Sequence, residues 1–596
     1  MSSINYSFLE RTHLPKLPIP PLESTLPRYL DTVKNIASRD EYEHTEKLVA
    51  KFASNEAKIL QEELLELDQE CPTSYLEGFW NTMYLTLRAP LMINVSPFGI
   101  YMDDNRRKSQ IERAASLLYS TARFAKKLEK GQVDDLVGMI HSTDLCVSQY
   151  RTIFSSRIPN ETRDEMILCG DSRYVVICCR GFFYKVGIMD DARKLVPEEQ
   201  LEVSLRAIVQ DAESQGEAKY DVGILTTENR TTWARARAQL IAESPVNKHT
   251  IDTIDNALMV YCLDHRSPKN LTQISKLSLH SGNGKNRWFD KSLQCLVFKN
   301  GVSSPIIEHS HLDGDTHHAF SNFVVNDAAQ REPYYHRDIR YHPKFEKLHW
   351  KLSRSSKRTI RQAEVNAAQL ISTLDLEAFR FSDFGKLAIK NEMKISPNSV
   401  VQMAMQLAFY RQHLKPGSTY EPINMKKYYH GRTEAVRTVT RESVEFTRAF
   451  VSPLTSIEEK ERRLRAACDR HRQLCTDNAN GLGIDRHLYA LHRLAEHREQ
   501  RLPNCHVPEI FLDPLYTRMK TDLMTSSNMS GSNTVILGGF GAVCAEGIAV
   551  GYIMDDEGIR FCLSSYTEKA KLFKQFLETS LRDIRDVLMA KSRAKI

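Results

Sequence analysis

The sequence predicts an α/β or α+β fold in which mixed sheets are flanked by helices, and three observations support this prediction. Short apolar arms joined by turn residues form candidate hairpins at residues 173–186, 292–308 and 548–563. Amphipathic helices are predicted as well, for example from Ile111 onward, ahead of the first hairpin. The 596 residues are 41% apolar and 26% charged, which is typical of globular proteins and is enough for more than one compact region.

The chain opens with an extended arm. Residues 14–22 read Leu-Pro-Lys-Leu-Pro-Ile-Pro-Pro-Leu, and this density of proline excludes a helix. We expect the arm to pack on its own domain, although a recognition motif is the alternative. The helix that follows is indicated by apolar residues with helical spacing, namely Ala114, Ala115, Leu118, Ala122 and Ala125.

Hairpins and buried strands dominate the next part of the chain. Residues 173–186 predict a hairpin that turns at Arg180-Gly181, and residues 257–263 predict a buried strand. The hairpin at 292–308 turns at Asn300-Gly301, because Asn-Gly between apolar arms is a strong hairpin signal. Its second strand delivers Glu308-His309-Ser310 at its end.

The second half of the chain predicts a connection followed by further helices and a hairpin. Residues 329–365 are polar, rich in Lys and Arg and without a clear period, so we expect a connection between lobes there. Ser396-Pro397 predicts the start of a core helix, with proline at the first helical position. Ser565-x-x-Glu568 resembles a capping box that would start the last helix.

Charge and cysteine content exclude several function classes. Lys plus Arg (81) exceeds Asp plus Glu (75) by so little that nucleic-acid binding is not expected. The twelve cysteines contain no CxxC pair, which disfavours a cysteine zinc site and favours reduced, intracellular thiols. No apolar stretch reaches the length of a transmembrane helix.

One segment contains the candidate catalytic residues. His309-Ser310-His311-Leu312-Asp313-Gly314 has the form H-x-x-x-D-G, and an imidazole at a strand end suits general-base work near neutral pH. A loop histidine beside a turn aspartate is the structural alternative. His311, His317 and His318 lie nearby, but they lack a metal-binding frame, so no metal site is predicted.

The same segment resembles the catalytic signature of the carnitine/choline acyltransferases. Further segments in family order support this resemblance, and they span nearly the whole chain. They are Leu14–Pro20, Asn286–Ser292, His430–Arg437, Ile484–Leu488 and Leu537–Phe540. Within the family, the Gly-Gly-Phe run is most similar to that of palmitoyl-transferring members.

The resemblance implies a fold of two similar acyltransferase lobes with an active-site tunnel between them. On this basis residues 91–345 form an N-terminal lobe that carries His309. Residues 14–90 plus 346–590 form the other lobe, and 591–596 are a tail. Acyl-CoA and carnitine are the implied substrates, with no permanently bound cofactor, and we expect a monomer.

The resemblance also assigns catalytic roles. His309 would take the proton of the carnitine hydroxyl as its oxygen attacks the thioester, and Asp313 would support the histidine or its neighbours. Because the transfer is direct, no serine or cysteine nucleophile is needed. A hydroxyl of the run Thr525-Ser526-Ser527 would donate to the oxyanion, with Ser526 and Ser527 as the candidates and the alignment uncertain by one residue.

The positions implied for substrate binding form two further sets. Tyr420, Thr433, Arg486 and Thr525 match carnitine-binding positions. Arg486 suits the carboxylate, which choline lacks. Lys386, Lys390, Asn398 and Glu421 match positions near CoA. Two positions depart from the family pattern near CoA: Asn398 stands where aspartate is common, and Pro422 stands where serine is common.

The preferred length of the acyl group and the cellular location are also inferred. In acetyl-selective members a methionine occupies the position of Gly538, so Gly538 and Gly539 imply an open acyl pocket for medium- to long-chain groups. A short-chain or choline enzyme, or a non-catalytic acyl-CoA-binding relative, is the alternative. Ala594-Lys595-Ile596 resembles a degenerate peroxisomal address, and residues 131–150 lack the insertion of mitochondrial members. The mitochondrial matrix is the alternative location, if a leader has been removed.

Overall fold

The computed structural model describes residues 4–132, 144–332, 341–566 and 569–593. The chain divides into two compact units, and each is built from separate segments of the chain. The first contains Met1–Arg11, Asn81–Leu374 and Met529–Gly541, and the second contains Thr12–Trp80, Asp375–Asn528 and Ala542–Ile596. Each unit is described by itself below.

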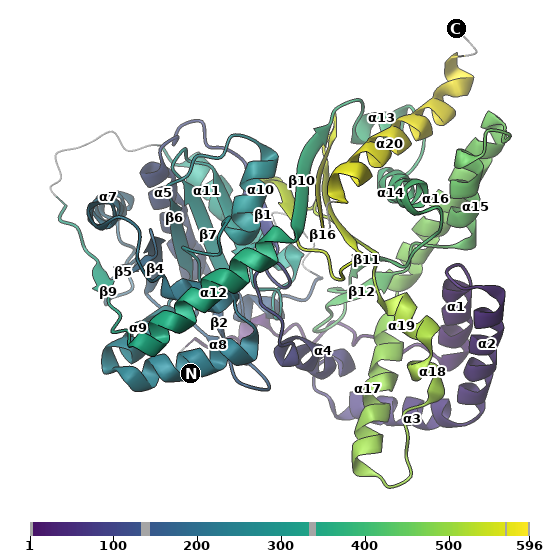
Figure 1. Cartoon of the computed structure of the whole chain (residues 1–596), viewed down its shortest axis with the longest axis horizontal. Coiled ribbons are helices and arrows are strands. Elements are labelled where there is room, and N and C mark those ends of the chain that lie inside the picture. Colours follow the sequence, from purple (N-terminus) through teal and green to yellow (C-terminus); the bar gives the residue numbers. More distant parts are fainter. Residues whose placement is uncertain (1–3, 133–143, 333–340, 567–568, 594–596) are drawn as a thin grey trace. The chain divides into compact units, whose positions relative to one another are not determined.

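The first unit is organised around an eight-stranded mixed sheet (Figure 1). Only the central β7, β6 and β4 pair in parallel, and the other neighbours are antiparallel. In spatial order the strands are β14 (Val535–Gly539), β1 (Phe98–Tyr101), β8 (Ser303–Ile307), β7 (Leu293–Phe298), β6 (Val260–Asp264), β4 (Tyr174–Cys179), β5 (Phe182–Gly187) and β9 (Glu346–Leu348).

The two hairpins predicted in this sheet are confirmed. β4 and β5 are joined by Arg180 and Gly181, which both have positive φ, 52° and 79°. In the β7–β8 turn only Gly301 has a positive φ, 79°, and its N–H donates to Phe298 O at 2.9 Å. Glycine adopts this conformation without steric cost, which explains its place in both turns.

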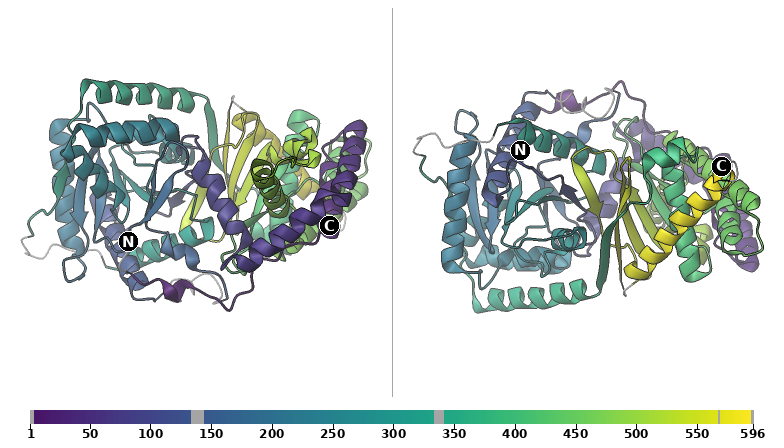
Figure 2. Two further views of the ribbon diagram at one scale, coloured as in Figure 1. Left: turned by 90° about the horizontal axis from the view of Figure 1, so that it is seen from below. Right: turned by 90° about the horizontal axis from the view of Figure 1, so that it is seen from above.

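Helices flank the sheet of the first unit. The predicted helix is α5 (Gln110–Glu129), which begins with a capping box at Ser109 and packs against α7 (Glu198–Gln215) and α11 (Gly314–Gln330). The long α12 (Arg354–Ser372) is the teal-green helix at the top of the left view in Figure 2. It contacts α8 (Arg230–Glu243). The remaining elements are η1 (Ser7–Leu9), η2 (Ser148–Arg151), η3 (Val222–Thr227), α8 (Arg230–Glu243), α9 (Pro245–Asp255), α10 (Leu271–His280) and the hairpin of β2 (Ser155–Ile158) and β3 (Glu165–Leu168).

The second unit contains a six-stranded sheet. Its spatial order is β10 (Leu374–Phe381), β16 (Ile559–Tyr566), β15 (Ile548–Met554), β13 (Met524–Asn528), β11 (Thr419–Asn424) and β12 (Thr433–Val436). β13 pairs in parallel with β11 and β15, whereas the β15–β16 and β11–β12 pairs are antiparallel. The predicted hairpin at 548–563 is therefore confirmed.

A hydrophobic core lies between this sheet and three helices. α14 (Pro397–His413) begins at Ser396, whose side chain accepts from Ser399 N, as the Ser-Pro pattern predicts. It packs with α16 (Ile457–Ala479) and α20 (Ala570–Arg593), and the three contribute most helical residues of the core. α20 is the yellow helix of Figures 1 and 2.

The remaining helices of this unit include the long α17. They are α1 (Leu22–Val33), α2 (Arg39–Ser54), α3 (Glu56–Glu70), α4 (Tyr75–Thr86, divided between the units), α13 (Lys386–Asn391), α15 (Arg441–Val451), α17 (Asp485–Arg501), α18 (Glu509–Leu512) and α19 (Pro514–Lys520). The arm before α1 packs on its own unit, since Leu14 and Leu17 are buried and Tyr429 N donates to Pro15 O at 2.8 Å.

Some boundaries differ from the predicted ones. Residues 346–374 belong to the first unit, because β9 pairs with β5 at the edge of that sheet. β14 joins the same unit by pairing with β1. The expected polar connection at 329–365 instead contains the end of α11, β9 and most of α12.

The C-terminal end also departs from the prediction. The last helix does not start at Ser565, because this residue continues β16 opposite Ile548. Glu568 and Ala594–Ile596 lie outside the described residues, but α20 reaches Arg593, so the predicted tail begins as helix. The predicted mixed α/β fold class is nevertheless confirmed.

Candidate functional site

His309 lies directly beyond the end of β8 in the first unit. Two backbone hydrogen bonds hold this point, from Glu308 N to Ser292 O at 3.0 Å and from His309 N to Val95 O at 3.1 Å. The imidazole is half-buried, and its centroid lies 6.0 Å from that of the Tyr84 ring, at 64°. The predicted hairpin therefore delivers the histidine at a strand end, as expected.

The imidazole of His309 is held in one tautomer. Its Nδ1 lies 2.7 Å from Leu312 O, and a carbonyl oxygen can only accept a hydrogen bond. In the neutral imidazole Nδ1 therefore carries the proton, and Nε2 is the nitrogen with the lone pair. This is the arrangement that a general base requires.

Asp313 is buried and bonded to a residue that the sequence analysis did not single out. Its carboxylate accepts from Gln149 Nε2 at 2.5 Å, and its backbone N–H donates to Gln149 Oε1 at 2.9 Å. Asp313 precedes α11 as its N-cap, but its side chain makes no capping hydrogen bond. Sequence spacing gives no sign of this pairing, because Gln149 lies far from Asp313 along the chain.

The residues on either side of His309 are anchored by a buried arginine. Arg157 Nη1 donates to Glu308 Oε1 at 3.0 Å and to Ser310 Oγ at 2.7 Å. The side chains of Arg157 and Glu308 are both 0% exposed, so the Glu308 carboxylate depends on Arg157 for charge compensation. The pairing ties the histidine's two neighbours to one fixed group.

The network continues into residues 286–292, the segment that resembles a family motif. Asp164 Oδ2 accepts from Arg157 and from Arg230, each at 2.7 Å, and Asp290 accepts from Arg230 at 2.6 Å. Burial raises the pKa of Asp164, but the charges of Arg230 and Arg157 outweigh this effect and hold the pKa below its usual value. The conspicuous motif thus has a supporting role in the first unit.

Gly538 and Gly539 lie on β14, where Gly538 pairs with Gly99 of β1. A Cβ built on Gly538 would collide with Met529 Sδ and would lie 2.9 Å from Phe98 O. The space beside Gly538 is therefore not an empty channel, since the Met529 side chain occupies it. A thioether is flexible, so this space can open by rotation of one side chain.

Three of the residues predicted to bind carnitine meet in the second unit. Arg486, in the first turn of α17, donates from Nε to Thr433 O at 2.9 Å and from Nη2 to Tyr420 OH at 3.3 Å. Its guanidinium lies over the Trp80 ring, 4.8 Å from the centroid. Both hydrogen bonds go to neutral oxygens, and they fix the orientation of the guanidinium.

Glu434 is a titratable neighbour of this group. It follows Thr433 on β12, is 5% exposed and accepts from its neighbour's amide, Ala435 N, at 2.7 Å. Burial raises the pKa of Glu434 to about 7, against the opposing effect of the Arg486 charge. A substantial fraction of this carboxyl is therefore uncharged at neutral pH.

The hydroxyl run on β13 is divided between the two faces of the strand. Ser526 Oγ accepts from Gln402 of α14 at 3.0 Å and donates to Tyr420 O at 3.2 Å. Thr525 and Ser527 point to the opposite face, because side chains alternate along a strand. The Thr525 hydroxyl is buried and has no hydrogen-bond partner in the described structure, whereas Ser527 is half-buried.

The two lysines predicted to meet CoA are exposed on the short α13. Lys386 Nζ lies 3.3 Å from Asp556 Oδ1, in the turn between β15 and β16. Lys386 N also donates to Asp555 O at 2.8 Å. The α13 segment and this turn are thus joined, and both lysines are accessible to solvent.

Asn398 and Glu421 belong to one buried polar cluster of the second unit. Asn398 Nδ2 donates to Glu421 Oε1 at 2.8 Å, and Tyr552 OH donates to Asn398 Oδ1 at 2.7 Å. Glu421 Oε2 lies 2.7 Å from His471 Nε2. The structure therefore brings these two predicted CoA positions together.

Glu421, His471 and Cys475 have ligand atoms within 4.8 Å of one another, and they form the one metal-like cluster found in the described part of the chain. Burial lowers the pKa of His471, but hydrogen bonds with Cys475 and Glu421 outweigh this effect and raise it to about 10. The protonated imidazole then forms an ion pair with Glu421, which accounts for the short distance between these two side chains.

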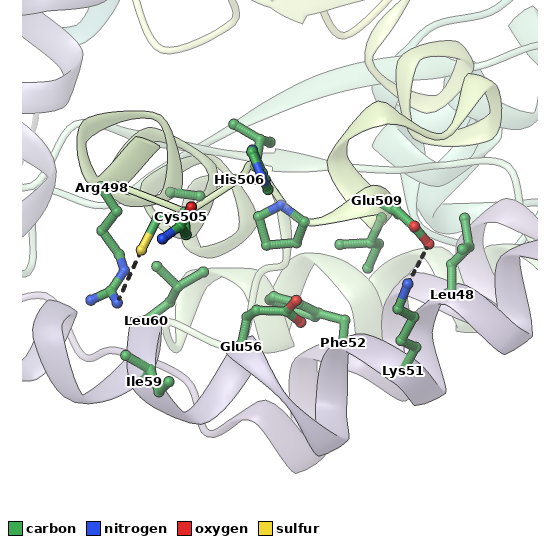
Figure 3. Close-up of a pocket in the computed structure, with 15 residues that line it drawn as sticks. Leu48, Lys51, Phe52, Glu56, Ile59, Leu60, Arg498, Cys505, His506 and Glu509 are labelled. Atoms are coloured by element: carbon green, nitrogen blue, oxygen red, sulfur yellow. Dashed lines mark hydrogen bonds and ion pairs between the residues drawn. The ribbon is translucent and has the colours of Figure 1, made fainter. Parts of the chain in front are cut away.

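A cavity of about 420 Å³ lies elsewhere in the second unit (Figure 3). It is lined by residues of α2, α3, α17, α18 and the loop that follows α17. The ion pair between Lys51 and Glu509, 2.9 Å apart, lies at one end of it (Figure 3). None of the predicted site residues lines this cavity.

These features define the class of protein. A histidine that presents an unprotonated nitrogen suits general-base group transfer. Comparison with known proteins identifies the family, since the choline/carnitine O-acyltransferase model matches residues 17–579.

Individual relatives extend over most of the chain. Carnitine O-palmitoyltransferase 2 of Rattus norvegicus is 32% identical and covers 97% of this chain and 92% of its own length. Choline O-acetyltransferase of Homo sapiens is 30% identical, with coverage of 97% and 80%. Peroxisomal carnitine O-octanoyltransferase of Bos taurus is 32% identical, with coverage of 86% and 85%.

The chain belongs to the choline/carnitine O-acyltransferase family. It is an acyltransferase that uses CoA or acyl-CoA as a substrate and needs no permanently bound cofactor. Within the described residues, no helix combines the length and the apolar character that spanning a bilayer requires.

Proposed function

We propose that this chain reversibly transfers a medium- to long-chain acyl group between CoA and the hydroxyl of carnitine. The orientation of the Arg486 side chain is the observation that most directly supports carnitine as the acceptor. A guanidinium oriented by Thr433 O and Tyr420 OH suits a carboxylate. Carnitine has this carboxylate and choline does not.

The proposed reaction is a direct transfer. His309 Nε2 takes the hydroxyl proton of carnitine while the hydroxyl oxygen attacks the thioester carbonyl. The tetrahedral intermediate collapses with loss of the CoA thiolate, which takes the proton back from His309. Thr525 and Ser527 are the favoured donors to the oxyanion, because the Ser526 hydroxyl already donates to Tyr420 O.

Asp313 is proposed to hold the loop of the histidine rather than to react itself. For CoA, the proposal assigns the exposed Lys386 and Lys390 to its phosphates. It assigns Asn398 and Glu421 to a supporting position, because they bond to each other at 2.8 Å in a buried cluster.

The proposed chain length rests on Gly538 and Gly539 and on two similar relatives that are named for palmitoyl and octanoyl transfer. Met529 fills the space beside Gly538, so an alkyl tail would have to displace it. Each methylene buried there is worth about 0.8 kcal/mol. Another relative is named for acetyl transfer to choline, so shorter acyl groups and choline are the outcomes to test against.

The test is release of free CoA from acetyl-, octanoyl- and palmitoyl-CoA, each with carnitine and with choline. The proposal expects carnitine-dependent release that is fastest with the two longer acyl groups and is lost in His309→Ala. Faster release with choline would mean that choline, and not carnitine, is the acceptor. Faster release with acetyl-CoA would mean that the enzyme prefers short acyl groups. If no acceptor releases CoA, the chain is a binding relative and not an enzyme.

We also propose a peroxisomal location, on the basis of Ala594-Lys595-Ile596. These residues lie outside the described ones, and the similar relatives include both peroxisomal and mitochondrial proteins. An N-terminally tagged chain should enter peroxisomes, and deletion of the last three residues should prevent this. Mitochondrial import of the untagged chain would contradict the proposal.

A further inference from the structure

We propose that Gln149 is the positioning residue that holds His309 in its reactive tautomer, through the peptide group between Leu312 and Asp313. This inference rests on the proposed role of His309 as general base. It adds a residue to which neither the sequence motifs nor the comparisons assign a role.

Gln149 lies in η2, and its side chain reaches the loop between His309 and α11. Its Nε2 donates to Asp313 Oδ2 at 2.5 Å. Its Oε1 accepts from Asp313 N and from Thr316 Oγ1, each at 2.9 Å. The residue is 9% exposed, so these bonds form in a largely water-free environment where they are strong.

The connection to the histidine passes through one peptide group. Leu312 O accepts from His309 Nδ1 at 2.7 Å, and Asp313 N, at the other end of the same planar group, donates to Gln149. The second bond therefore fixes the plane in which the carbonyl points at the imidazole. It also polarises the carbonyl, because hydrogen bonds in a chain strengthen one another.

The chemistry of an amide is what this position requires. Two donors, Asp313 N and Thr316 Oγ1, face the oxygen of Gln149, and a carboxylate faces its nitrogen. Only a side chain with both an acceptor and a donor satisfies all three. A glutamate of the same shape would place two carboxylates against each other.

The conformation of Asp313 agrees with this view. An aspartate at an N-cap usually accepts from the first amides of the helix that follows. Asp313 makes no such bond to α11 and instead accepts from Gln149. The Asp313 side chain thus bonds to Gln149 instead of capping α11.

The experiment compares Gln149→Leu and Gln149→Glu with the wild type in the carnitine-dependent CoA-release assay. Gln149→Leu has no acceptor for Asp313 N, so we expect its kcat to fall by at least about tenfold, which corresponds to partial loss of general-base catalysis. The KM for carnitine and for acyl-CoA should change less than about twofold, because Gln149 binds neither substrate. The acid limb of the kcat/KM profile should move to lower pH in Gln149→Leu, since the imidazolium loses an oriented acceptor.

The matched control is Gln110→Leu in the same unit. Gln110 is half-buried and donates to Asp264 O at 2.8 Å and to Val297 O at 2.7 Å, so its loss removes comparable amide bonds elsewhere in the sheet. We expect Gln110→Leu to lower the thermal midpoint while kcat per folded molecule and the pH profile stay unchanged.

Each outcome separates this inference from the proposed function. If the wild type shows no activity that depends on His309, the proposed function fails. If the wild type is active and Gln149→Leu keeps kcat within about twofold per folded molecule, the positioning role is wrong. Gln149→Glu keeps an acceptor for Asp313 N, so its kcat should stay closer to that of the wild type. Should Gln149→Leu not fold, Gln149→Met, which also lacks this acceptor, decides in its place.

Discussion

Two arginine-centred groups, one in each unit, are built in opposite ways. Arg157 lies beside the segment of His309, is 0% exposed and donates to the carboxylates of Asp164 and Glu308. Arg486 is half-buried and donates to two neutral oxygens, Thr433 O and Tyr420 OH. A guanidinium paired with buried carboxylates holds the surrounding segments together, whereas the two bonds to neutral oxygens set the orientation of the Arg486 guanidinium.

The difference also appears in the neighbouring carboxyls. In the first unit the arginines outweigh burial and hold the pKa of Asp164 low. In the second unit burial outweighs the charge of Arg486 and raises the pKa of Glu434 to about 7. Charge compensation is thus permanent in one group and depends on pH in the other.

The largest effect should come from His309→Ala, which removes the group that the first network supports. We expect kcat to fall by about 10²–10⁴-fold, the usual contribution of general-base catalysis. Single-turnover measurement with octanoyl-CoA and carnitine checks this. A variant that keeps a tenth of the wild-type rate would show that the first unit does not supply the base.

The next effect concerns stability. Asp164→Asn leaves Arg157 and Arg230 buried without their shared carboxylate, so we expect a loss of about 3–5 kcal/mol in the free energy of unfolding. Urea unfolding followed by circular dichroism measures it. Glu161→Gln is the control, because its partner Arg235 is mostly exposed and little change is expected. Equal stability of the two variants would mean that the buried Asp164 pairs do not stabilise the first unit.

Arg486→Ala tests the second network. Loss of a hydrogen bond to a charged group costs about 1.5–3 kcal/mol, so the KM for carnitine should rise roughly ten- to a hundredfold while that for acyl-CoA stays the same. Arg493→Ala, in the same helix and paired with Glu496, should leave both values unchanged. An unchanged KM for carnitine in Arg486→Ala would remove this residue from the site.

Met529→Ala sharpens the assignment of the acyl pocket. The shorter side chain frees the space beside Gly538, and each additional buried methylene is worth about 0.8 kcal/mol, or roughly fourfold in affinity. We therefore expect the ratio of kcat/KM for palmitoyl-CoA over acetyl-CoA to rise several-fold. Gly538→Met is a harsher test, since any side chain there also approaches Phe98 O. A constant ratio across acyl lengths in Met529→Ala would place the pocket elsewhere.

The smallest effect concerns pH. As pH rises through about 7, Glu434 ionises and competes with carnitine for Arg486, so the KM for carnitine should rise about twofold between pH 6 and 8. Because the raised pKa of Glu434 favours its protonated form in the folded state, its contribution to stability falls over the range from its ordinary value up to about 7. Glu434→Gln should flatten the KM profile. Asp485, another carboxyl near Glu434, pairs with Arg437 and is left unchanged in this variant. A profile of KM that is the same in wild type and variant would mean that Glu434 does not modulate this site.

Local sequence chemistry predicted much of the secondary structure. The turns at Arg180-Gly181 and Asn300-Gly301 and the helix start at Ser396-Pro397 depend on backbone preferences of adjacent residues, and all three occur. The family motifs likewise indicated His309 and Arg486, because catalysis and carboxylate binding need particular residue types at fixed spacing. These features are determined within a few residues of chain.

Tertiary structure decided what depends on partners far away in the sequence. Ser565 looked like a helix cap, but pairing with Ile548 keeps it in a strand. β9 and β14 joined the first unit through pairing with β5 and β1, and no local pattern encodes such a register.

The same holds within the candidate site. The sequence by itself determined the family, the strand end at which His309 lies and the proposal that this histidine is the base. Only the folded chain brought Gln149 against Asp313 and Met529 against Gly538. Hydrogen bonding and packing act over distances in space, whereas residue preferences act over distances along the chain.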